Sequence, residues 1–371
     1  MRLNCLINYK IVRERLTLFS IILSFLLIEA HATEWYRNDD MASLYESITK
    51  ISSESLYVKD QKSIPQDLLK NYIHKIDLYG DYFTKNEYKA FQNTLSVEYA
   101  GIGMMLYQQE RSGKILCIPT SEHLIEEGIS KYDQLVSVDG RPVEGKNFYL
   151  VSSWIRGAKN SSVELEILKS SGQLHQIKLK RTQQHFHTTQ KVTENGIAMI
   201  QIIRFMSETP QELQKILEKW PKTIPIVIDL RGNGGGDLFA AIKSADLLLP
   251  KDTLIISIET KTKHFDYHTS TPDILQGRVV YLLQDKFTAS ASEVFIAALT
   301  QNNRAKSIGK KSFGKGVAQK FIPLNNGDAL LLTYGKIITP NGKNYHNIGL
   351  IPTSDLSLKE HIDISLSGNT F

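Results

Sequence analysis

A serine turn between a predicted strand and a predicted helix is the clearest place in this sequence for covalent chemistry. The apolar run 279–284 predicts a buried strand, and the apolar run 294–299 predicts a helix. Ser290 lies in the turn between them, and Glu293 follows three residues later. A hydroxyl here can act as a nucleophile, and the free N–H groups at the helix start can hold an anion. The same pair also fits an ordinary capping box, in which Ser290 only begins the helix.

A lysine segment further along the chain favours chemistry over capping. Lys315 lies between Gly314 and Gly316, with no acidic neighbour in the sequence. Burial would lower the pKa of its amine, and a neutral amine can act as a base. Residues 309–315 also match the phosphate-loop pattern, but Gly316 stands where that motif needs Ser or Thr, and residues 317–323 predict a strand. We therefore discount a nucleotide site.

Together, the two segments resemble the carboxyl-terminal processing peptidases, also called tail-specific proteases. The family's Ser-Ala-Ser-Glu turn stands here at residues 290–293, and its Phe-Gly-Lys-Gly segment at residues 313–316, followed by Gln319. The resemblance implies a serine peptidase in which Ser290 is the nucleophile and Lys315 is the general base. Gln319 would hold the lysine amine in position, as the third member of a triad does. The resemblance requires no histidine, no metal and no cofactor.

The resemblance also assigns an oxyanion hole. The family's Asp-Leu-Arg-x-Asn-x-Gly-Gly pattern stands at residues 229–236, after a predicted buried strand. It implies Gly236 as one backbone donor, with Gly235 as the alternative, and the N–H of Ala291 as the other. Losing one such donor typically costs about 10²–10³ in rate. Ser292, the second serine of the turn, is expected to cap or pack.

Residues 96–183 resemble a PDZ domain, a module that binds peptide C-termini. Gly101, Ile102, Gly103 and Met104 look like its carboxylate-binding loop, in which backbone N–H groups converge on an anion. A glycine-rich hairpin turn would explain this loop equally well. A helix predicted over residues 148–156 would flank an apolar groove, for which we expect the lining Ile102, Met104, Leu106 and Val151.

The predicted fold is an α/β core with a β-rich domain and a helical N-terminal region. From residue 184 to 371, strands and helices alternate, which indicates a mainly parallel sheet. The resemblance makes this core a crotonase- or ClpP-like spiral. Residues 33–95 predict helices, which would cover the core or form a homodimer. The polar stretch 183–189 predicts a linker, whose His185 and His187 lack a third ligand, so we predict no metal site.

The first 32 residues predict a secretory signal. A basic start is followed by the apolar run 16–28 and by Ala-His-Ala at residues 30–32, a small-residue cleavage pattern. The run is short for a membrane span, although an uncleaved anchor is the alternative. Cleavage would leave Cys117 as the single cysteine, so the fold would not depend on an intrachain disulfide. We expect the protein in the periplasm or cell envelope.

These patterns predict an exported serine endopeptidase that cleaves proteins recognised by apolar C-terminal tails. Its partners would be proteins or peptides with free C-termini, with an adaptor possible. The net charge of +5 gives no reason to expect a nucleic-acid partner. Two alternatives stay open: an exported PDZ scaffold whose peptidase fold is silent, and a crotonase-fold enzyme acting on acyl thioesters.

Overall fold

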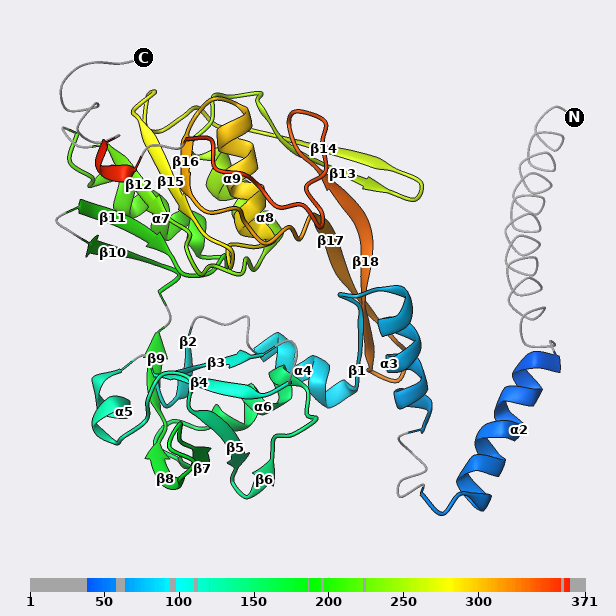
Figure 1. Ribbon diagram of the computed structural model, residues 1–371. Helices are drawn as coiled ribbons and strands as arrows, with labels where there is room; N and C mark the ends of the chain where they lie inside the picture. The colour runs from blue at the N-terminus through cyan, green and yellow to red at the C-terminus, as the bar shows by residue number, and fades with distance from the viewer. Residues whose placement is uncertain are drawn as a thin grey trace, which may run out of the picture. The chain divides into compact units, whose positions relative to one another are not determined.

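The computed structural model describes nine stretches of the chain. These are residues 39–57, 64–93, 98–109, 113–119, 121–185, 187–194, 197–222, 225–354 and 357–360. The predicted signal at residues 1–32 lies outside them. The chain divides into two compact units, Met1–Tyr72 and Ile73–Phe371 (Figure 1).

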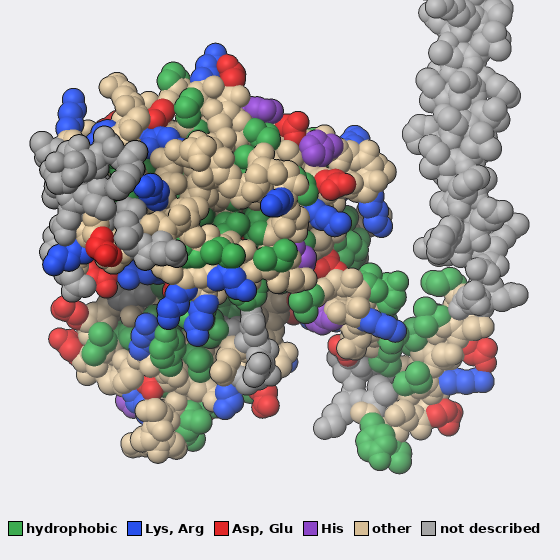
Figure 2. All heavy atoms as spheres, turned by 45° about the horizontal axis from the view of Figure 1, so that its top comes forward, with side chains coloured by type: hydrophobic (Ala, Val, Ile, Leu, Met, Phe, Trp, Pro, Cys, Tyr) green, Lys and Arg blue, Asp and Glu red, His purple; other side chains and the backbone are tan. Residues whose placement is uncertain are grey.

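The first unit contributes helical segments with exposed apolar side chains. Helix α2 spans Asp39–Glu54, and helix α3, Ile64–Ile76, begins in this unit. Hydrophobic side chains reach the surface along both helices (green in Figure 2). No helix among the described residues is long and apolar enough to cross a membrane. The exposed large apolar residues of this unit include Met41, Leu44, Tyr45, Ile51, Leu56, Tyr57, Leu68, Leu69 and Tyr72.

A five-stranded sheet forms the centre of the second unit. The strand order is β10-β11-β12-β15-β16 (Figure 1). Strands β11, β12, β15 and β16 run parallel, and β10 pairs antiparallel with β11. Parallel neighbours need crossover helices, and the chain supplies them between the strands. This confirms the predicted α/β core. The elements are β10 (Thr189–Glu194), β11 (Ile197–Ile202), α7 (Thr209–Glu218), β12 (Ile226–Asp229), α8 (Leu238–Asp246), β15 (Val280–Gln284), α9 (Ala291–Gln301) and β16 (Lys306–Gly309).

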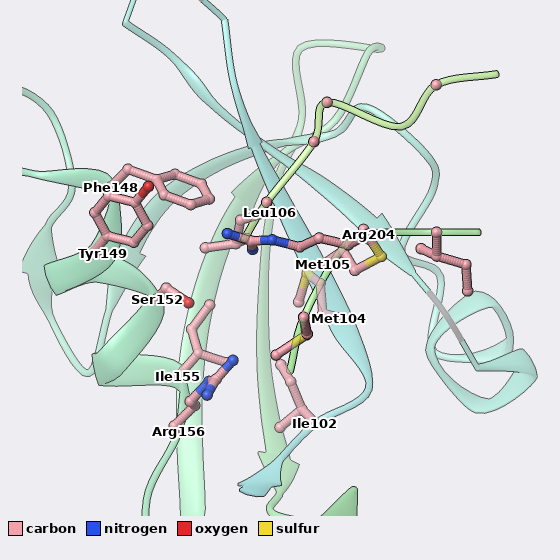
Figure 3. A pocket seen from close by; sticks show the side chains of 16 residues that line it. Ile102, Met104, Met105, Leu106, Phe148, Tyr149, Ser152, Ile155, Arg156 and Arg204 are labelled. Atoms are coloured by element: carbon pink, nitrogen blue, oxygen red, sulfur yellow. The ribbon is translucent and has the colours of Figure 1, made fainter. Parts of the chain in front are cut away.

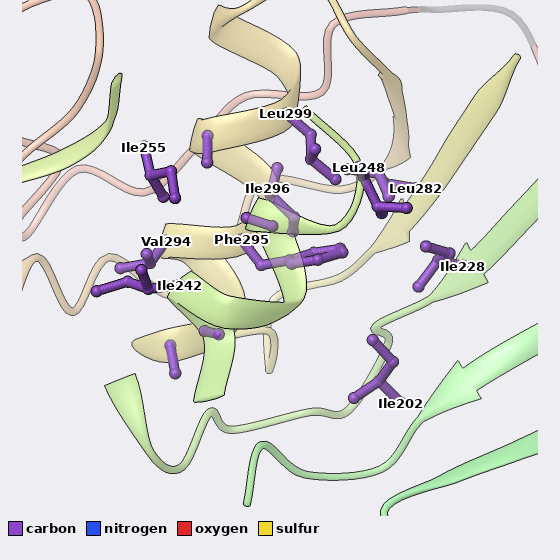
Figure 4. Close-up of a cluster of buried hydrophobic side chains, with 14 of the residues drawn as sticks. Ile202, Ile228, Ile242, Leu248, Ile255, Leu282, Val294, Phe295, Ile296 and Leu299 are labelled. Carbon is purple, nitrogen blue, oxygen red and sulfur yellow. The ribbon is translucent and has the colours of Figure 1, made fainter. Parts of the chain in front are cut away.

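Helix α9 lies inside the main hydrophobic core. Every residue from Ala291 to Leu299 is buried, so the helix is apolar on all sides except where Ser292 and Glu293 make hydrogen bonds. A helix that is apolar all round belongs in a core. Figure 4 shows its side chains packed with those of α8 and of the central strands. The start of α9, which carries the serine turn, is therefore held by packing.

A second, antiparallel sheet packs into the same core. Its strand order is β1-β18-β13-β14, and β17 pairs with β18. Within the predicted helical region 33–95, strand β1 is an addition: its three residues, between α3 and α4, pair with β18. The elements are β1 (Asp81–Phe83), α4 (Lys85–Asn93), β13 (Leu254–Thr260), β14 (His264–His268), β17 (Val317–Pro323) and β18 (Ala329–Ile338).

The middle segment, residues 98–185, folds around its own buried cluster. Its sheet has the order β3-β4-β5-β7-β8, with β6 paired to β5, and β2 pairs separately with β9. The expected linker is wrong in part, because residues 182–185 form β9 and Thr189 begins β10. The elements are β2 (Glu98–Gly101), β3 (Met104–Gln108), β4 (Ile115–Pro119), α5 (Glu122–Glu126), β5 (Gln134–Val138), β6 (Arg141–Pro142), α6 (Phe148–Ile155), β7 (Ser162–Leu168), β8 (Leu174–Lys180) and β9 (Thr182–His185).

Candidate active site

Ser290 occupies a strained turn between β15 and α9. Its backbone has φ 57° and ψ −119°, a conformation that residues with a side chain rarely adopt. Such outliers persist only when the surrounding structure holds them, and they gather at functional sites. The turn is fixed by Thr288, whose hydroxyl donates to the carbonyl of Leu230 at 2.9 Å. The predicted strand–turn–helix is therefore present, and its serine is half-buried at the start of a buried helix.

The carboxylate of Glu293 joins the serine turn to the loop of residues 312–316, which carries Lys315 and is called the lysine loop below. One oxygen accepts the N–H groups of Ser290 and Lys315, each at 2.8 Å. The other accepts the N–H of Gly314 at 2.6 Å and the hydroxyl of Ser312 at 2.5 Å. The side chain is fully buried. Burial raises the pKa of Glu293, and the four donors oppose that rise.

The sequence suggested only a local capping box for Glu293. The structure contains one hydrogen bond of such a box, from the N–H of Ser290 to the Glu293 carboxylate. The other three donors come from residues 312–315, about twenty positions away in the chain. Sequence spacing gave no signal for that longer connection.

Asn233 connects the glycine loop, residues 231–236 after β12, to the serine turn. Its side chain donates to the carbonyl of Ile202 at 2.8 Å and accepts the N–H of Gly235 at 2.9 Å. Its carbonyl accepts the N–H of Ala289 and the hydroxyl of Ser292, both at 3.0 Å. Ser292 is fully buried in this contact, which agrees with the packing role expected for it.

Two backbone N–H groups near Ser290 are free to bind an anion. Within the described part of the chain, those of Gly236 and Ala291 have no hydrogen-bond partner, whereas that of Gly235 is occupied by Asn233. Gly236 is also exposed, whereas Gly235 is buried. The geometry therefore favours Gly236 over Gly235 as the donor from this loop.

The glycine at position 236 is required by a close backbone approach. Its φ is 134°, and a Cβ there would lie 2.0 Å from the carbonyl oxygen of Phe205. The N–H of Phe205 donates to the carbonyl of Gly235, and the N–H of Asp237 donates to the carbonyl of Phe205. These two hydrogen bonds form a parallel bridge between Phe205 and Gly236. They hold the residues before and after Gly236, and so they fix the direction of the Gly236 N–H.

Lys315 lies in a small polar arrangement with Gln319 and Tyr79. Its Nζ donates to Gln319 Oε1 at 2.7 Å and lies 4.6 Å from the centre of the Tyr79 ring. Gln319 Nε2 in turn donates to the carbonyl of Tyr79 at 2.6 Å. Among the hydrogen bonds of the described residues, none joins Lys315 Nζ to Ser290 Oγ. Burial lowers the pKa of Lys315, and the nearby Asp77 carboxylate opposes this weakly.

Tyr79 was missed by the sequence analysis. It lies in the turn that follows α3, where the residue types in the sequence gave no indication of chemistry. Lys315 and Tyr79 are more than two hundred residues apart, so only the fold shows that they meet.

The predicted residues of the reaction centre line one cavity of about 540 Å³. A serine, a lysine and two backbone donors that open into the same space could act on one bound group. The predicted site residues along this cavity are Ser290, Ala291, Gly236, Lys315 and Gln319.

A second cavity, of about 330 Å³, lies beside the glycine loop (Figure 3). Ile102, Met104 and Leu106 line it as expected, but Val151 does not, because it is fully buried in the core of the middle segment. The α6 residues that do line it are Phe148, Tyr149, Ser152 and Ile155. Of the expected carboxylate loop, Gly101 ends β2 and Gly103 has φ 74°, and neither lines the cavity.

Chemically, this arrangement suits transfer of an acyl group to a serine, which is the reaction of serine-type hydrolases.

Comparisons with known proteins show which family of hydrolases the chain resembles. Residues 196–356 match the model of peptidase family S41. A probable CtpA-like serine protease of Staphylococcus haemolyticus is 31% identical over 294 residues, which cover 78% of this chain and 59% of that protein. One from Staphylococcus saprophyticus is 29% identical over 324 residues, covering 85% and 65%.

The fold also resembles that of a solved structure. A photosystem II D1 C-terminal processing protease superimposes with a TM-score of 0.59 and 21% identity, covering 86% of this chain and 90% of the other. This likeness concerns the fold. Residues 196–356 are therefore similar to peptidase family S41, and the relatives that the chain matches are named as serine proteases. The chain spans about three fifths to two thirds of the length of the two staphylococcal relatives.

Proposed function

We propose that this chain is a serine endopeptidase of the C-terminal processing type, with Ser290 as nucleophile and Lys315 as general base. The observation that carries the proposal is the buried Glu293 carboxylate, which fixes the serine turn and the lysine loop to each other. It brings both residues to one cavity, although 24 residues separate them in the chain. A capping role for Ser290 alone would not need this connection.

The first half of the reaction forms an acyl-enzyme. Neutral Lys315 takes the proton of Ser290 Oγ as that oxygen attacks the peptide carbonyl. The N–H groups of Gly236 and Ala291 hold the oxyanion. The lysine ammonium then gives its proton to the leaving amine. Water attacks the acyl-serine in the second half, and the same amine serves as base again.

This route requires the lysine amine to gain a hydrogen bond to Ser290 Oγ while it keeps its hydrogen bond to Gln319. Nζ is now held by Gln319 and the Tyr79 ring. Catalytic hydrogen bonds are often absent in a free enzyme and form when substrate binds. Gln319 would act as the positioning partner of the amine throughout.

We assign the second cavity to the substrate's C-terminal tail. Its apolar lining suits an apolar side chain, and Arg204 extends into it (Figure 3). Within the described residues, the guanidinium of Arg204 has no hydrogen bond or ion pair. It can therefore attract the tail's terminal carboxylate. The partners under this proposal are protein substrates with free C-termini.

Export and assembly are further parts of the proposal. The signal-like first 32 residues support a periplasmic or cell-envelope location. The exposed apolar side chains of α2 and α3 support a homodimer formed through these helices. Delivery of substrates by an adaptor is a prediction that sedimentation with candidate envelope proteins would check.

The test compares residues 33–371 of the wild type with the Ser290→Ala variant. Each is incubated with an unfolded protein such as casein, with and without an added apolar C-terminal tail. We expect cleavage by the wild type alone, faster with the tail. Equal cleavage by both proteins would contradict the assignment of Ser290, and equal rates with and without the tail would contradict tail recognition.

A further inference from the structure

The turn that follows α3 is held against β18 of the antiparallel sheet. Asp77 accepts the backbone N–H of Thr333 at 2.7 Å and its hydroxyl at 3.0 Å, which ties the turn to β18. Asp77 also accepts the N–H of Tyr79 at 3.1 Å. Gly80 closes the turn through its N–H to the carbonyl of Asp77 at 3.0 Å. Tyr79 is thus presented to the lysine site by a defined backbone.

Tyr79 contacts both members of the lysine–glutamine pair. The face of its ring lies under the amine of Lys315, with 4.6 Å between Nζ and the ring centre. Its carbonyl accepts the Nε2 of Gln319 at 2.6 Å. The ring meets His346 edge-on, with 5.8 Å between centres, which limits its rotation.

The carbonyl contact determines which end of the Gln319 amide faces the lysine. A glutamine amide has one donating end and one accepting end. Because the Tyr79 carbonyl can only accept, it takes Nε2, and Oε1 is left for the lysine amine. The reverse orientation would set two donors against each other at Lys315 and two acceptors against each other at Tyr79.

We propose that Tyr79 is a positioning residue for the lysine–glutamine pair: its carbonyl orients Gln319, and its ring stabilises the protonated amine of Lys315. This inference rests on the proposed role of Lys315 as base. The ring face attracts a cation, and the attraction strengthens when water is excluded. It acts against burial, which disfavours the ammonium. The ring thereby raises the pH at which the amine loses its proton and becomes a base.

Other titratable groups face the same site from the surrounding elements. Asp77 also raises the pKa of Lys315, but Asp77 is held by β18 and Glu293 by the two loops, so we expect both carboxylates to stay in place when the Tyr79 side chain is changed. The groups to consider in a pH experiment are Asp77, Asp237, Glu293, Tyr334, Tyr345 and His346.

Two substitutions separate the ring from the carbonyl. Tyr79→Leu removes the aromatic face, and Tyr79→Phe keeps it, while both retain the backbone carbonyl. Removing a cation–π contact worth about 0.5–2 kcal/mol lowers the midpoint of lysine titration by about 0.4–1.5 pH units. We therefore expect that shift in Tyr79→Leu and a midpoint near that of the wild type in Tyr79→Phe.

The measurement is an NMR titration of the lysine Cε–Hε groups in the full chain, with the Lys315 signal assigned by its loss in Lys315→Ala. An unchanged midpoint in Tyr79→Leu, or equal shifts in both variants, would overturn the inference. A purely structural role would lower activity at every pH without moving the midpoint. If Tyr79→Leu does not fold by circular dichroism, Tyr79→Met takes its place with the same expected shift.

The same variants separate this inference from the proposed function. The pH profile of kcat/KM for peptide cleavage is recorded alongside the titration, and its rising limb is expected to move with the Lys315 midpoint. A titration that shifts while Lys315→Ala still cleaves normally would contradict the role of Lys315 as base, and the ring contact would stand. A rising limb that stays fixed while the titration shifts would have the same meaning.

Discussion

At the scale of single residues, Glu293 is the connection on which the site depends. A buried carboxylate that accepts four donors fixes two loops at once. Hydrogen bonds to a charged acceptor are worth about 1.5–3 kcal/mol, and unsatisfied buried donors cost as much again. The distance between Ser290 and Lys315 is therefore set by a residue that touches no substrate.

The variant Glu293→Gln tests this role. An amide keeps the size of the side chain but replaces one carboxylate oxygen with an NH₂ group, which donates. That group would face either the N–H groups of Ser290 and Lys315, or the N–H of Gly314 and the hydroxyl of Ser312. We expect kcat/KM to fall at least about 10²-fold, because small misplacements of reacting groups cost that much. The free energy of unfolding should fall by about 1.5–3 kcal/mol.

Ser312→Ala is the matched control for Glu293→Gln. It removes one of the four donors and leaves the carboxylate in place. Its effect on kcat/KM and on the denaturation midpoint should be clearly smaller. Wild-type kcat/KM in Glu293→Gln would show that the carboxylate does not set the geometry.

The sequence could name candidate residues only where a motif was local. Ser290, Lys315 and Gln319 could be named because they lie in short segments with a recognisable pattern. Tyr79 was not, since its contact with Lys315 depends on how α3 ends and on the pairing of β1 with β18. Val151 was placed in the groove by its helical position, but α6 is rotated so that Val151 faces the core.

At the scale of elements, the glycine loop after β12 is shaped by its contact with Phe205. Gly236 has a φ that favours glycine, and a Cβ would overlap the Phe205 carbonyl. Gly234, two residues earlier, would place a Cβ in open space. The two glycines therefore differ in what their backbone requires.

Alanine at each of these two positions should give opposite results. Gly236→Ala forces the loop away from Phe205 and should destabilise the protein by about 1–3 kcal/mol. Gly234→Ala should leave the denaturation midpoint near that of the wild type. The measurement is chemical denaturation followed by circular dichroism. Equal midpoints for the two variants would contradict the close approach seen at Gly236.

Elements that follow a clear apolar run were predicted more closely than an element of three residues. Strand β15 and helix α9 lie where the apolar runs 279–284 and 294–299 predicted a strand and a helix. Strand β1 has three residues and exists because β18 offers a free edge. Such an element has too few residues to show a period, so it could not be read from the sequence.

At the scale of the whole molecule, the proposed function assigns tail recognition to one cavity and the reaction to the other. The smaller cavity is lined by apolar side chains and carries Arg204, whereas the larger one holds the candidate catalytic residues. The glycine loop lines both, since Gly234 and Gly236 border each of them. A bound tail would therefore lie against the loop that carries an oxyanion donor.

Substitution of Arg204 tests the assignment of the smaller cavity. Arg204→Ala removes a charge that would face the tail's carboxylate, so KM for a tailed peptide should rise about fivefold to tenfold with kcat nearly unchanged. The control is the same peptide with an amidated C-terminus. There the loss should largely vanish, and an equal rise in KM for both peptides would contradict the contact.

In the proposed mechanism, Ser290 is a nucleophile activated by a neutral Lys315, and every later step depends on this activation. The most direct measurement is the rate of labelling by a fluorophosphonate probe as a function of pH, with the labelled residue located by peptide mass spectrometry. Ser292→Ala is the matched serine control, because Ser292 is buried against Asn233. We predict one label, on Ser290, in the wild type and in Ser292→Ala. Its rate should rise with pH to a midpoint below the ordinary lysine value of 10.5, since burial lowers the pKa of Lys315, and that rise should be lost in Lys315→Ala. Labelling of another residue, or a rate that does not change with pH, would contradict the claim.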